Sequence, residues 1–138
     1  MNRCIVALMG VWSLISTCGR SPESIIKSQF SIDLKTIDHH VDLFNDYYYP
    51  NGDGETEIII RLEKELPDSL IQHIKASSKA CDLPFPCDID SFIPSFLKES
   101  NQGVYFFDRI NPEHTYFDHI LFVYDRTTSI IYYHLVIT

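Results

Sequence analysis

Histidines and carboxylates that could bind a metal ion or transfer protons occur in two segments. His39 and His40 stand in DHHVD, residues 38–42, and His114 and His119 stand five residues apart in EHTYFDH. Along a strand, side chains an odd number of residues apart point to opposite faces, so neither pair is expected to share a metal ion. We expect His114 and His119 to be solvated loop residues.

The segment DHHVD also resembles the motif of a metal-binding phosphoesterase family. That family needs further aspartates on other strands of an N-terminal nucleotide-binding-like domain, which the length and order of elements here do not supply. No serine stands in a G-x-S-x-G segment either. The sequence therefore predicts no catalytic residue, no cofactor and no metal. A hydrolase of envelope polymers is the enzymatic alternative, favoured by any concave pocket that gathers His39 or His40 with Asp38, Asp42 or Asp108.

The segment NGDGETE, residues 51–57, allows two interpretations. It resembles part of a calcium loop, but Tyr49 and Ile60 then occupy the first and twelfth positions, where carboxylates bind calcium. Asn-Gly and Asp-Gly also tolerate the positive φ angles of a tight turn, and an apolar strand follows at Ile58–Leu62. We favour a β-hairpin turn.

The N-terminus has the pattern of a secretory signal peptide. Arg3 precedes the uncharged run CIVALMGVWSLIS, which is shorter than the roughly 20 residues that span a bilayer. The residues IST before Cys18 resemble the lipobox at which bacterial lipoprotein signal peptides are cleaved and the cysteine is lipidated, although Thr17 is a less usual residue there. We expect residues 1–17 to be removed and Cys18 to carry a palmitate-type membrane anchor. An ordinary cleaved signal and an uncleaved amphipathic anchor are the alternatives.

Two cysteines then remain in the mature chain, Cys81 and Cys87 in CDLPFPC. An even number of cysteines outside the cytoplasm is typical of a disulfide bond. So short a closed loop contributes about 2 kcal/mol in the chain-entropy model. We predict a disulfide between Cys81 and Cys87, with two free thiols as the alternative.

Composition limits the partners. Without residues 1–17, 121 of the 138 residues remain, and the loss of Arg3 changes the net charge from −8 to −9. This length suits one domain with a modest core. An acidic surface disfavours nucleic acid, which needs clustered Lys and Arg. A neutral or basic protein is the expected partner, beside the membrane reached through the lipid.

The remaining pattern predicts an α+β fold, a single antiparallel sheet of five or six strands with one main helix packed on one face. Residues 18–28 are expected to be a tether and 29–138 the single domain. Residues 29–49 fit strands, although Ile26 to Val41 also has helical spacing. A helix of about three turns is expected in LPDSLIQHIKASSKA. Strands are expected in GVYFFDRI, FDHILFVYDR and SIIYYHLVIT, the last two joined as a hairpin at Asp125–Thr128.

The last hairpin is apolar on both faces, which is typical of central strands that are covered twice. It also carries much of the tyrosine content, five of the eight tyrosines lying after residue 104. Tyrosines on a sheet belong to the core or to a protein interface, because the ring buries area while its hydroxyl keeps a partner. The candidate binding surface consists of Tyr105, Tyr124, Tyr132 and Tyr133.

The segments NGDGETEIIIRL, LPFP, GVYFFDR and HILFVYDRTTSIIYYHLVIT resemble a loose group of uncharacterised small bacterial proteins. That group has GDG-E-T, GYYFF-x-DR and AIYD…LYYY patterns in the same order, and the resemblance covers about residues 41–138. Val104 replaces one aromatic residue of the pattern, and HLVIT lacks its acidic residue. The resemblance implies no activity and no catalytic residue.

Together these patterns predict an exported bacterial lipoprotein of the cell envelope that acts as a non-enzymatic, membrane-tethered binding module. An immunity-type inhibitor of a basic toxin is the alternative, because a small, acidic and aromatic-faced protein suits charge complementarity.

Overall fold

The computed structural model describes residues 20–110, 113 and 118–138, and the chain divides into two compact units, Met1–Leu34 and Lys35–Thr138. In the first unit, the described residues form helix α3 (Pro22–Phe30). A capping box begins this helix: Ser24 N–H donates to Ser21 Oγ at 3.1 Å, and Ser21 N–H donates to Ser24 Oγ at 2.9 Å. Within the tether expected at residues 18–28, the residues from Pro22 onward are helical, because Ser21 caps the helix and Pro22 stands in its first turn.

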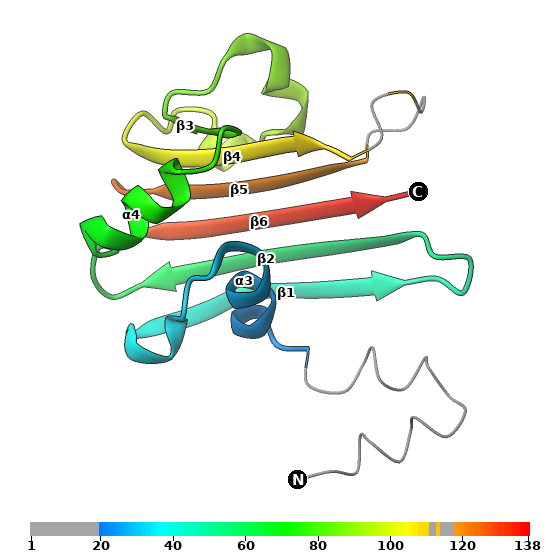
Figure 1. The fold of residues 1–138 in the computed structure, drawn as a ribbon, viewed down its shortest axis with the longest axis horizontal. Helices are drawn as coiled ribbons and strands as arrows, with labels where there is room; N and C mark the ends of the chain where they lie inside the picture. Colours follow the sequence, from blue (N-terminus) through cyan, green and yellow to red (C-terminus); the bar gives the residue numbers. More distant parts are fainter. Residues whose placement is uncertain (1–19, 111–112, 114–117) are drawn as a thin grey trace, which may run out of the picture. The chain divides into compact units, whose positions relative to one another are not determined.

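The second unit contains one antiparallel sheet of six strands in the order β1-β2-β6-β5-β4-β3 (Figure 1). Its strands and helices are β1 (His39–Tyr48), β2 (Gly54–Leu62), α4 (Asp68–Lys75), β3 (Ala80–Asp82), η3 (Cys87–Phe92), η4 (Ser95–Leu97), β4 (Gly103–Arg109), β5 (His119–Asp125) and β6 (Ile130–Ile137); the 3-10 helix η2 spans Leu34–Thr36. The predicted α+β class with a single antiparallel sheet is confirmed.

The β5–β6 hairpin lies at the centre of the sheet, as its apolar pattern predicts. β6 pairs with both β2 and β5, and β5 pairs with both β6 and β4. Its side chains are buried on both faces. In β5 the exposed fraction is 0% for four consecutive residues, Leu121, Phe122, Val123 and Tyr124. Each face of these strands therefore needs its own cover of apolar side chains.

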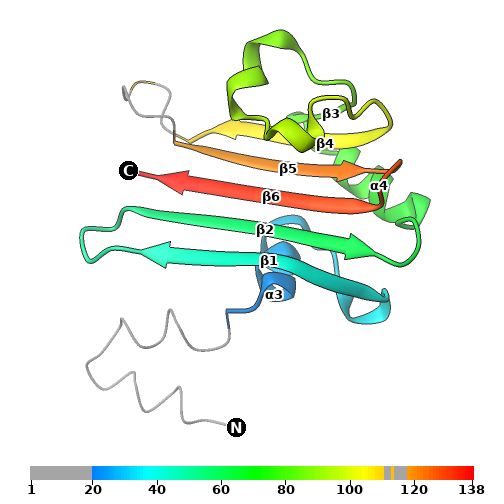
Figure 2. The same ribbon diagram turned by 180° about the vertical axis from the view of Figure 1, so that it is seen from behind.

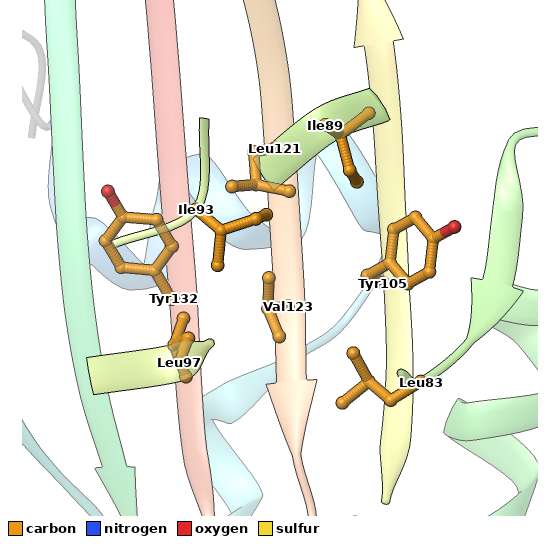
Figure 3. Packing of buried hydrophobic residues seen from close by; sticks show 8 residues of the cluster. All are labelled: Leu83, Ile89, Ile93, Leu97, Tyr105, Leu121, Val123 and Tyr132. Carbon is orange, nitrogen blue, oxygen red and sulfur yellow. The ribbon is translucent and has the colours of Figure 1, made fainter. Parts of the chain in front are cut away.

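One face is covered by the segment between β3 and β4, which contains η3 and η4. Figures 1 and 2 show this segment and α4 on opposite sides of the sheet. Its apolar side chains form a buried cluster with residues of β4, β5 and β6 (Figure 3). The cluster comprises Leu83, Ile89, Ile93, Leu97, Tyr105, Leu121, Val123 and Tyr132.

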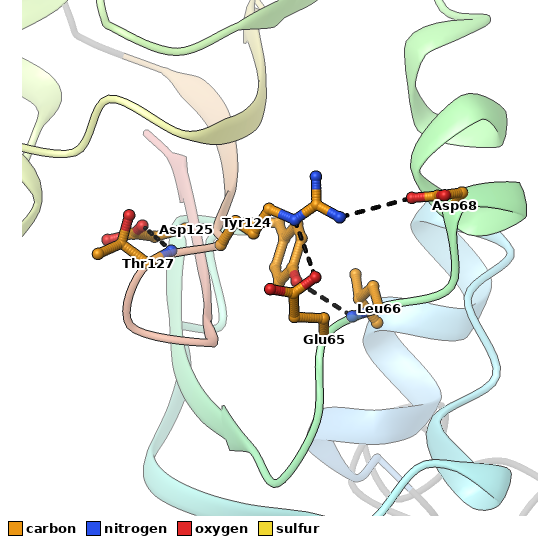
Figure 4. A network of polar contacts seen from close by, with 7 residues as sticks. Glu65, Leu66, Asp68, Tyr124, Asp125 and Thr127 are labelled. Atoms are coloured by element: carbon orange, nitrogen blue, oxygen red, sulfur yellow. Dashed lines mark hydrogen bonds and ion pairs between the residues drawn. The ribbon is translucent and has the colours of Figure 1, made fainter.

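On the other face, the connection from β2 to α4 is held by a buried hydrogen bond. The Leu66 N–H donates to the Tyr124 hydroxyl at 3.0 Å, so the tyrosine ring fills the core while its oxygen satisfies a backbone group (Figure 4). Arg126 reinforces this corner because its Nε donates to Glu65 Oε2 at 2.9 Å. The helix α4 contacts β3 and β4 beside it.

The structure differs from the sequence-based expectations in three local details. Residues Phe30, Ile32 and Leu34 form no strand, because α3 runs to Phe30 and η2 begins at Leu34. The helix α4 has eight residues rather than three turns. The second cover, formed by 3-10 helices, was not expected. The hairpin turns at residues 49–53 and 126–129 are confirmed.

We expect Leu97→Ala to destabilise the fold strongly, because Leu97 is 1% exposed within the cluster under η4. Removing a buried leucine side chain costs about 2–5 kcal/mol of unfolding free energy. The neighbouring Phe96 is 50% exposed, so the matched variant Phe96→Ala should cost about 1 kcal/mol or less. Urea unfolding of both variants measures the difference, and equal losses would contradict a core role for η4.

Candidate functional site

The four tyrosines expected to form a binding surface lie in the core instead. Tyr105 is 6%, Tyr124 0%, Tyr132 2% and Tyr133 0% exposed. They are buried because the sheet is covered on both faces. Of the two alternatives for these rings, core and protein interface, the structure shows the core. This corrects the predicted binding surface.

Three other tyrosines are exposed at the end of the β1–β2 hairpin. Tyr47, Tyr48 and Tyr49 are 61%, 44% and 67% exposed. Tyr48 lies directly opposite Gly54, and its ring occupies the space that a Cβ at Gly54 would fill. The glycine therefore permits the ring to pack across the strand. The YYY run beside NGDG marked this site in the sequence, but it was interpreted only as strand and turn.

Tyr47 and Tyr49 line an open pocket of about 280 Å³ together with carboxylates and the end of β6. The lining residues are Tyr47, Tyr49, Asp53, Gly54, Glu55, Val136, Ile137 and Thr138. None of these residues is basic. The pocket thus combines two aromatic rings with the carboxyl groups of Asp53 and Glu55, which is a chemical environment suited to a cation.

Glu55 is held by a line of hydrogen bonds that runs into the sheet. Its Oε1 lies 2.8 Å from His134 Nε2, and His134 Nδ1 lies 3.1 Å from His119 Nε2. The three side chains come from β2, β6 and β5. Register explains the line, because Glu55 and His119 both pair directly with Val136, and His134 stands two residues away on the same face.

His119 is therefore not the solvated loop residue that was expected. It begins β5, is 4% exposed and packs edge-on against the ring of Phe92, with ring centroids 4.8 Å apart. The odd separation that excludes a pair with His114 does not apply to His134, which belongs to the neighbouring strand. His114 itself lies outside the described residues.

The line also fixes the tautomers when Glu55 is ionised. A carboxylate only accepts hydrogen bonds, so His134 donates through Nε2 and its neutral ring accepts through Nδ1. His119 must then donate through Nε2 to His134 Nδ1. A proton added to this imidazole pair therefore lies on a chain of hydrogen bonds that ends at the Glu55 carboxylate.

His119 and His134 also line a second pocket of about 280 Å³ with Ser91 and Phe92. The segment that covers the sheet contributes Ser91 and Phe92, and the sheet contributes the imidazoles. Glu55 lines the hairpin-end pocket and bonds to His134, which lines this second one. One hydrogen bond therefore joins the surfaces of the two pockets.

The residues of DHHVD are not gathered with Asp108. His40 Nε2 lies 3.7 Å from Asp42 Oδ1 on β1, and His39 Nδ1 lies 2.6 Å from the Ile37 carbonyl oxygen. Asp108 lies on β4 and forms an ion pair with Lys79 at 2.5 Å. Because β2, β6 and β5 separate β1 from β4, His39 and His40 stand on a strand far across the sheet from that of Asp108.

Cys81 and Cys87 are free, exposed thiols, in contrast to the predicted disulfide. Cys81 lies on β3 opposite Tyr105, and a hydrogen bond links the Cys81 thiol to that tyrosine. Cys87 begins η3 beyond the prolines of the connecting loop. The two cysteines therefore belong to different elements: Cys81 to the edge strand β3, and Cys87 to η3 in the segment that covers the sheet.

Among the described residues, no helix is long and apolar enough to span a membrane, and no three side chains of the His, Cys, Asp or Glu types are placed to hold a metal ion. The signal peptide and Cys18 lie outside the described residues. Comparisons with protein-family models, curated proteins and solved structures found no match to this chain. The resemblance to a group of small bacterial proteins stays a prediction.

We expect the buried tyrosines to make the fold less stable in alkali. Burial, and then the Cys81 hydrogen bond, raise the pKa of Tyr105 to about 12. Burial and the neighbouring Glu57 carboxylate also raise the pKa of Tyr132 above its ordinary value. An unfolded tyrosine ionises near pH 10, so above about pH 10 the unfolded chain loses protons that the folded chain retains, and the unfolding free energy falls as pH rises.

Urea unfolding between about pH 8 and about pH 11 measures this decline. The variant Tyr105→Phe cannot ionise at this position, so its decline should be shallower than that of the wild type. An equal slope in the two proteins would contradict the role of Tyr105.

Proposed function

We propose that this protein is an exported bacterial lipoprotein whose folded part is a non-enzymatic binding module for a basic protein. The observation that carries the proposal is the end of the β1–β2 hairpin, where Tyr47, Tyr48 and Tyr49 are all exposed beside carboxylates. We call Tyr47, Tyr49, Asp53 and Glu55 the hairpin-end surface.

The aromatic part of this surface supports binding rather than folding. Tyrosine is enriched at protein interfaces because its ring buries a large area at low entropic cost while its hydroxyl finds a polar partner. Adjacent exposed rings at the end of a hairpin are unusual in a protein that buries its other sheet tyrosines. The rings of Tyr47 and Tyr49 therefore supply the apolar contact of the proposed interface.

The charge of the chain supports a basic partner. The net charge is −8, and Asp53 and Glu55 lie among the tyrosines. Complementary charge accelerates encounter and disfavours acidic competitors such as nucleic acid. A lipid on Cys18 would keep this surface at the membrane. A basic protein of the cell envelope would there have the charge opposite to that of the surface.

The anchor is tested by the intact mass of the protein extracted from bacterial membranes. We expect a chain that begins at Cys18 and carries the mass of several acyl chains, because one chain alone gives only marginal binding. The variant Cys18→Ala should lose this added mass and leave the membrane fraction. A chain without lipid would contradict the lipoprotein proposal and leave the binding module to be judged separately.

The binding module is tested with a nona-arginine peptide as probe. We expect the double variant Tyr47→Ser/Tyr49→Ser to weaken binding by about tenfold, because an exposed contact between a cation and an aromatic ring contributes about 0.5–1 kcal/mol. The matched variant Phe96→Ser removes a ring that is similarly exposed, 50%, on η4, and should bind as the wild type does. Fluorescence anisotropy at fixed ionic strength gives the dissociation constants.

Equal affinities of the two variants would mean that the peptide is held by the overall charge rather than by the hairpin-end surface. That result would contradict the proposed function. Circular dichroism of each variant separates loss of binding from loss of fold.

A further inference from the structure

Glu55 both lines the hairpin-end pocket and bonds to a histidine inside the sheet. From this double role we draw an inference that rests on the proposed function. One side of the residue lines the hairpin-end pocket with Tyr47, Tyr49 and Asp53. The same carboxylate bonds to His134 at 2.8 Å through Oε1. The Glu55 side chain is 56% exposed, whereas that of His134 is 18% exposed, so the pair joins solvent to the sheet interior.

We propose that the hairpin-end pocket binds one guanidinium or ammonium group of the basic partner, with Glu55 as its counter-ion, and that a proton on the His119–His134 pair opposes this binding. The protein would thus hold its partner at neutral pH and release it on acidification.

The shape and chemistry of the pocket favour a single cationic side chain. Its volume of about 280 Å³ is small, and the described residues that line it include two tyrosines and no basic residue. A cation over a tyrosine ring is attracted by the electrons of the ring, and the attraction grows as water is excluded. The carboxylates of Asp53 and Glu55 add charge-assisted hydrogen bonds, which a planar guanidinium makes in pairs.

The competition follows from the position of His134. When the imidazole pair gains a proton, a positive charge lies against Glu55, the residue that must neutralise the guest. The charged imidazolium both compensates the Glu55 carboxylate and repels a second cation in the pocket. Because linkage is reciprocal, a bound cation must make protonation of the pair harder by the same factor.

The other charged groups near the pair do not reverse this sign. From β2, Glu57 pairs directly with His134 and accepts a hydrogen bond from the Tyr132 hydroxyl of β6 at 3.1 Å. Its negative charge attracts a proton on the pair and a cation in the pocket alike, so it does not change which of the two opposes the other. From β4, Arg109 is the direct cross-strand partner of His119, and its strand lies on the side of the pair away from Glu55. The covering segment contributes Ser91 and Phe92, neither of which titrates. On β1, Tyr47 lies directly opposite Glu55, and its ring lines the pocket.

The pocket is tested with argininamide as probe, titrated by nuclear magnetic resonance at about pH 7.5. We expect Glu55→Gln to weaken binding by about fivefold or more, because the variant keeps the shape of the side chain and removes its charge. The matched variant Glu99→Gln makes the same change of net charge on an exposed residue outside the pocket, and it should bind as the wild type does. Equal weakening by both variants would overturn the pocket as the site.

The competition is tested by repeating the titration at about pH 5.5, on the acidic side of ordinary imidazole titration. The wild type should bind argininamide about threefold to tenfold more weakly than at about pH 7.5, and His134→Gln should lose most of this dependence. The control His40→Gln, on β1 beside Asp42, should keep it. In the wild type, saturating argininamide should also move the titration midpoint of the His134 ring signals to lower pH.

Equal affinity at both pH values, or an unmoved His134 midpoint, would overturn the competition. These failures are distinguishable from failure of the proposed function. If nona-arginine binding depends on Tyr47 and Tyr49 but argininamide ignores Glu55, the interface stands and the pocket inference falls. If nona-arginine binding is indifferent to both tyrosines, the interface itself falls.

Discussion

The need to bury both faces of the β5–β6 hairpin governs the rest of the sheet domain. Phe122 and Tyr124 point to one face, and Leu121 and Val123 point to the other, and all four are buried. Each face must be covered, because apolar area left in water costs roughly 25 cal/mol per Å². The corner that leads into α4 meets Tyr124 on one side, and η3 with η4 meets Leu121 and Val123 on the other (Figures 3 and 4).

This constraint also decides where the tyrosines can act. A ring at the centre of a sheet with two covers becomes part of the core, and the hydroxyls of two of these tyrosines have partners inside the protein. Tyr124 accepts from the Leu66 N–H, and Tyr132 donates to Glu57. Rings of the same type at the hairpin end stay exposed, as Tyr47 and Tyr49 do. Location in the sheet, rather than residue type, therefore separates structural tyrosines from candidate contact tyrosines.

The elements that the sequence predicted correctly are those whose patterns are local. Apolar segments and clear turn residues identified the β1–β2 and β5–β6 hairpins, and the two apolar faces of the β5–β6 hairpin indicated its central position. The covering segment was missed because it consists of short 3-10 helices around Pro84, Pro86 and Pro94, which have no regular apolar period. Helix α3 was missed because its polar composition hid the signal of Ser21 before Pro22, a cap followed by a proline in the first turn.

The candidate site was missed for a different reason, since its members are distant in sequence. Glu55, His134 and His119 come from three strands, and only the register brings them together. The β5–β6 turn was predicted from the sequence. Counting back along the two strands from Asp125 opposite Ile130 places His119 and His134 on the same face, so the proximity of these two histidines could have been predicted. The pairing of β2 with β6 was not, because it joins strands 68 or more residues apart and depends on tertiary packing.

The position of Glu55 follows from the same register and explains why one residue can serve both pockets. It lies in a cross-strand row with Tyr47, Val136 and His119, so it separates the exposed hairpin end from the interior imidazoles. A carboxylate further into the sheet would be less exposed to solvent, and one in the turn would be too far from His134 to bond to it. At this row the carboxylate keeps one oxygen on a partly buried imidazole while the side chain is 56% exposed. Because Glu55 lies at this boundary between core and solvent, a charge bound in the hairpin-end pocket can interact electrostatically with the His119–His134 pair inside the sheet.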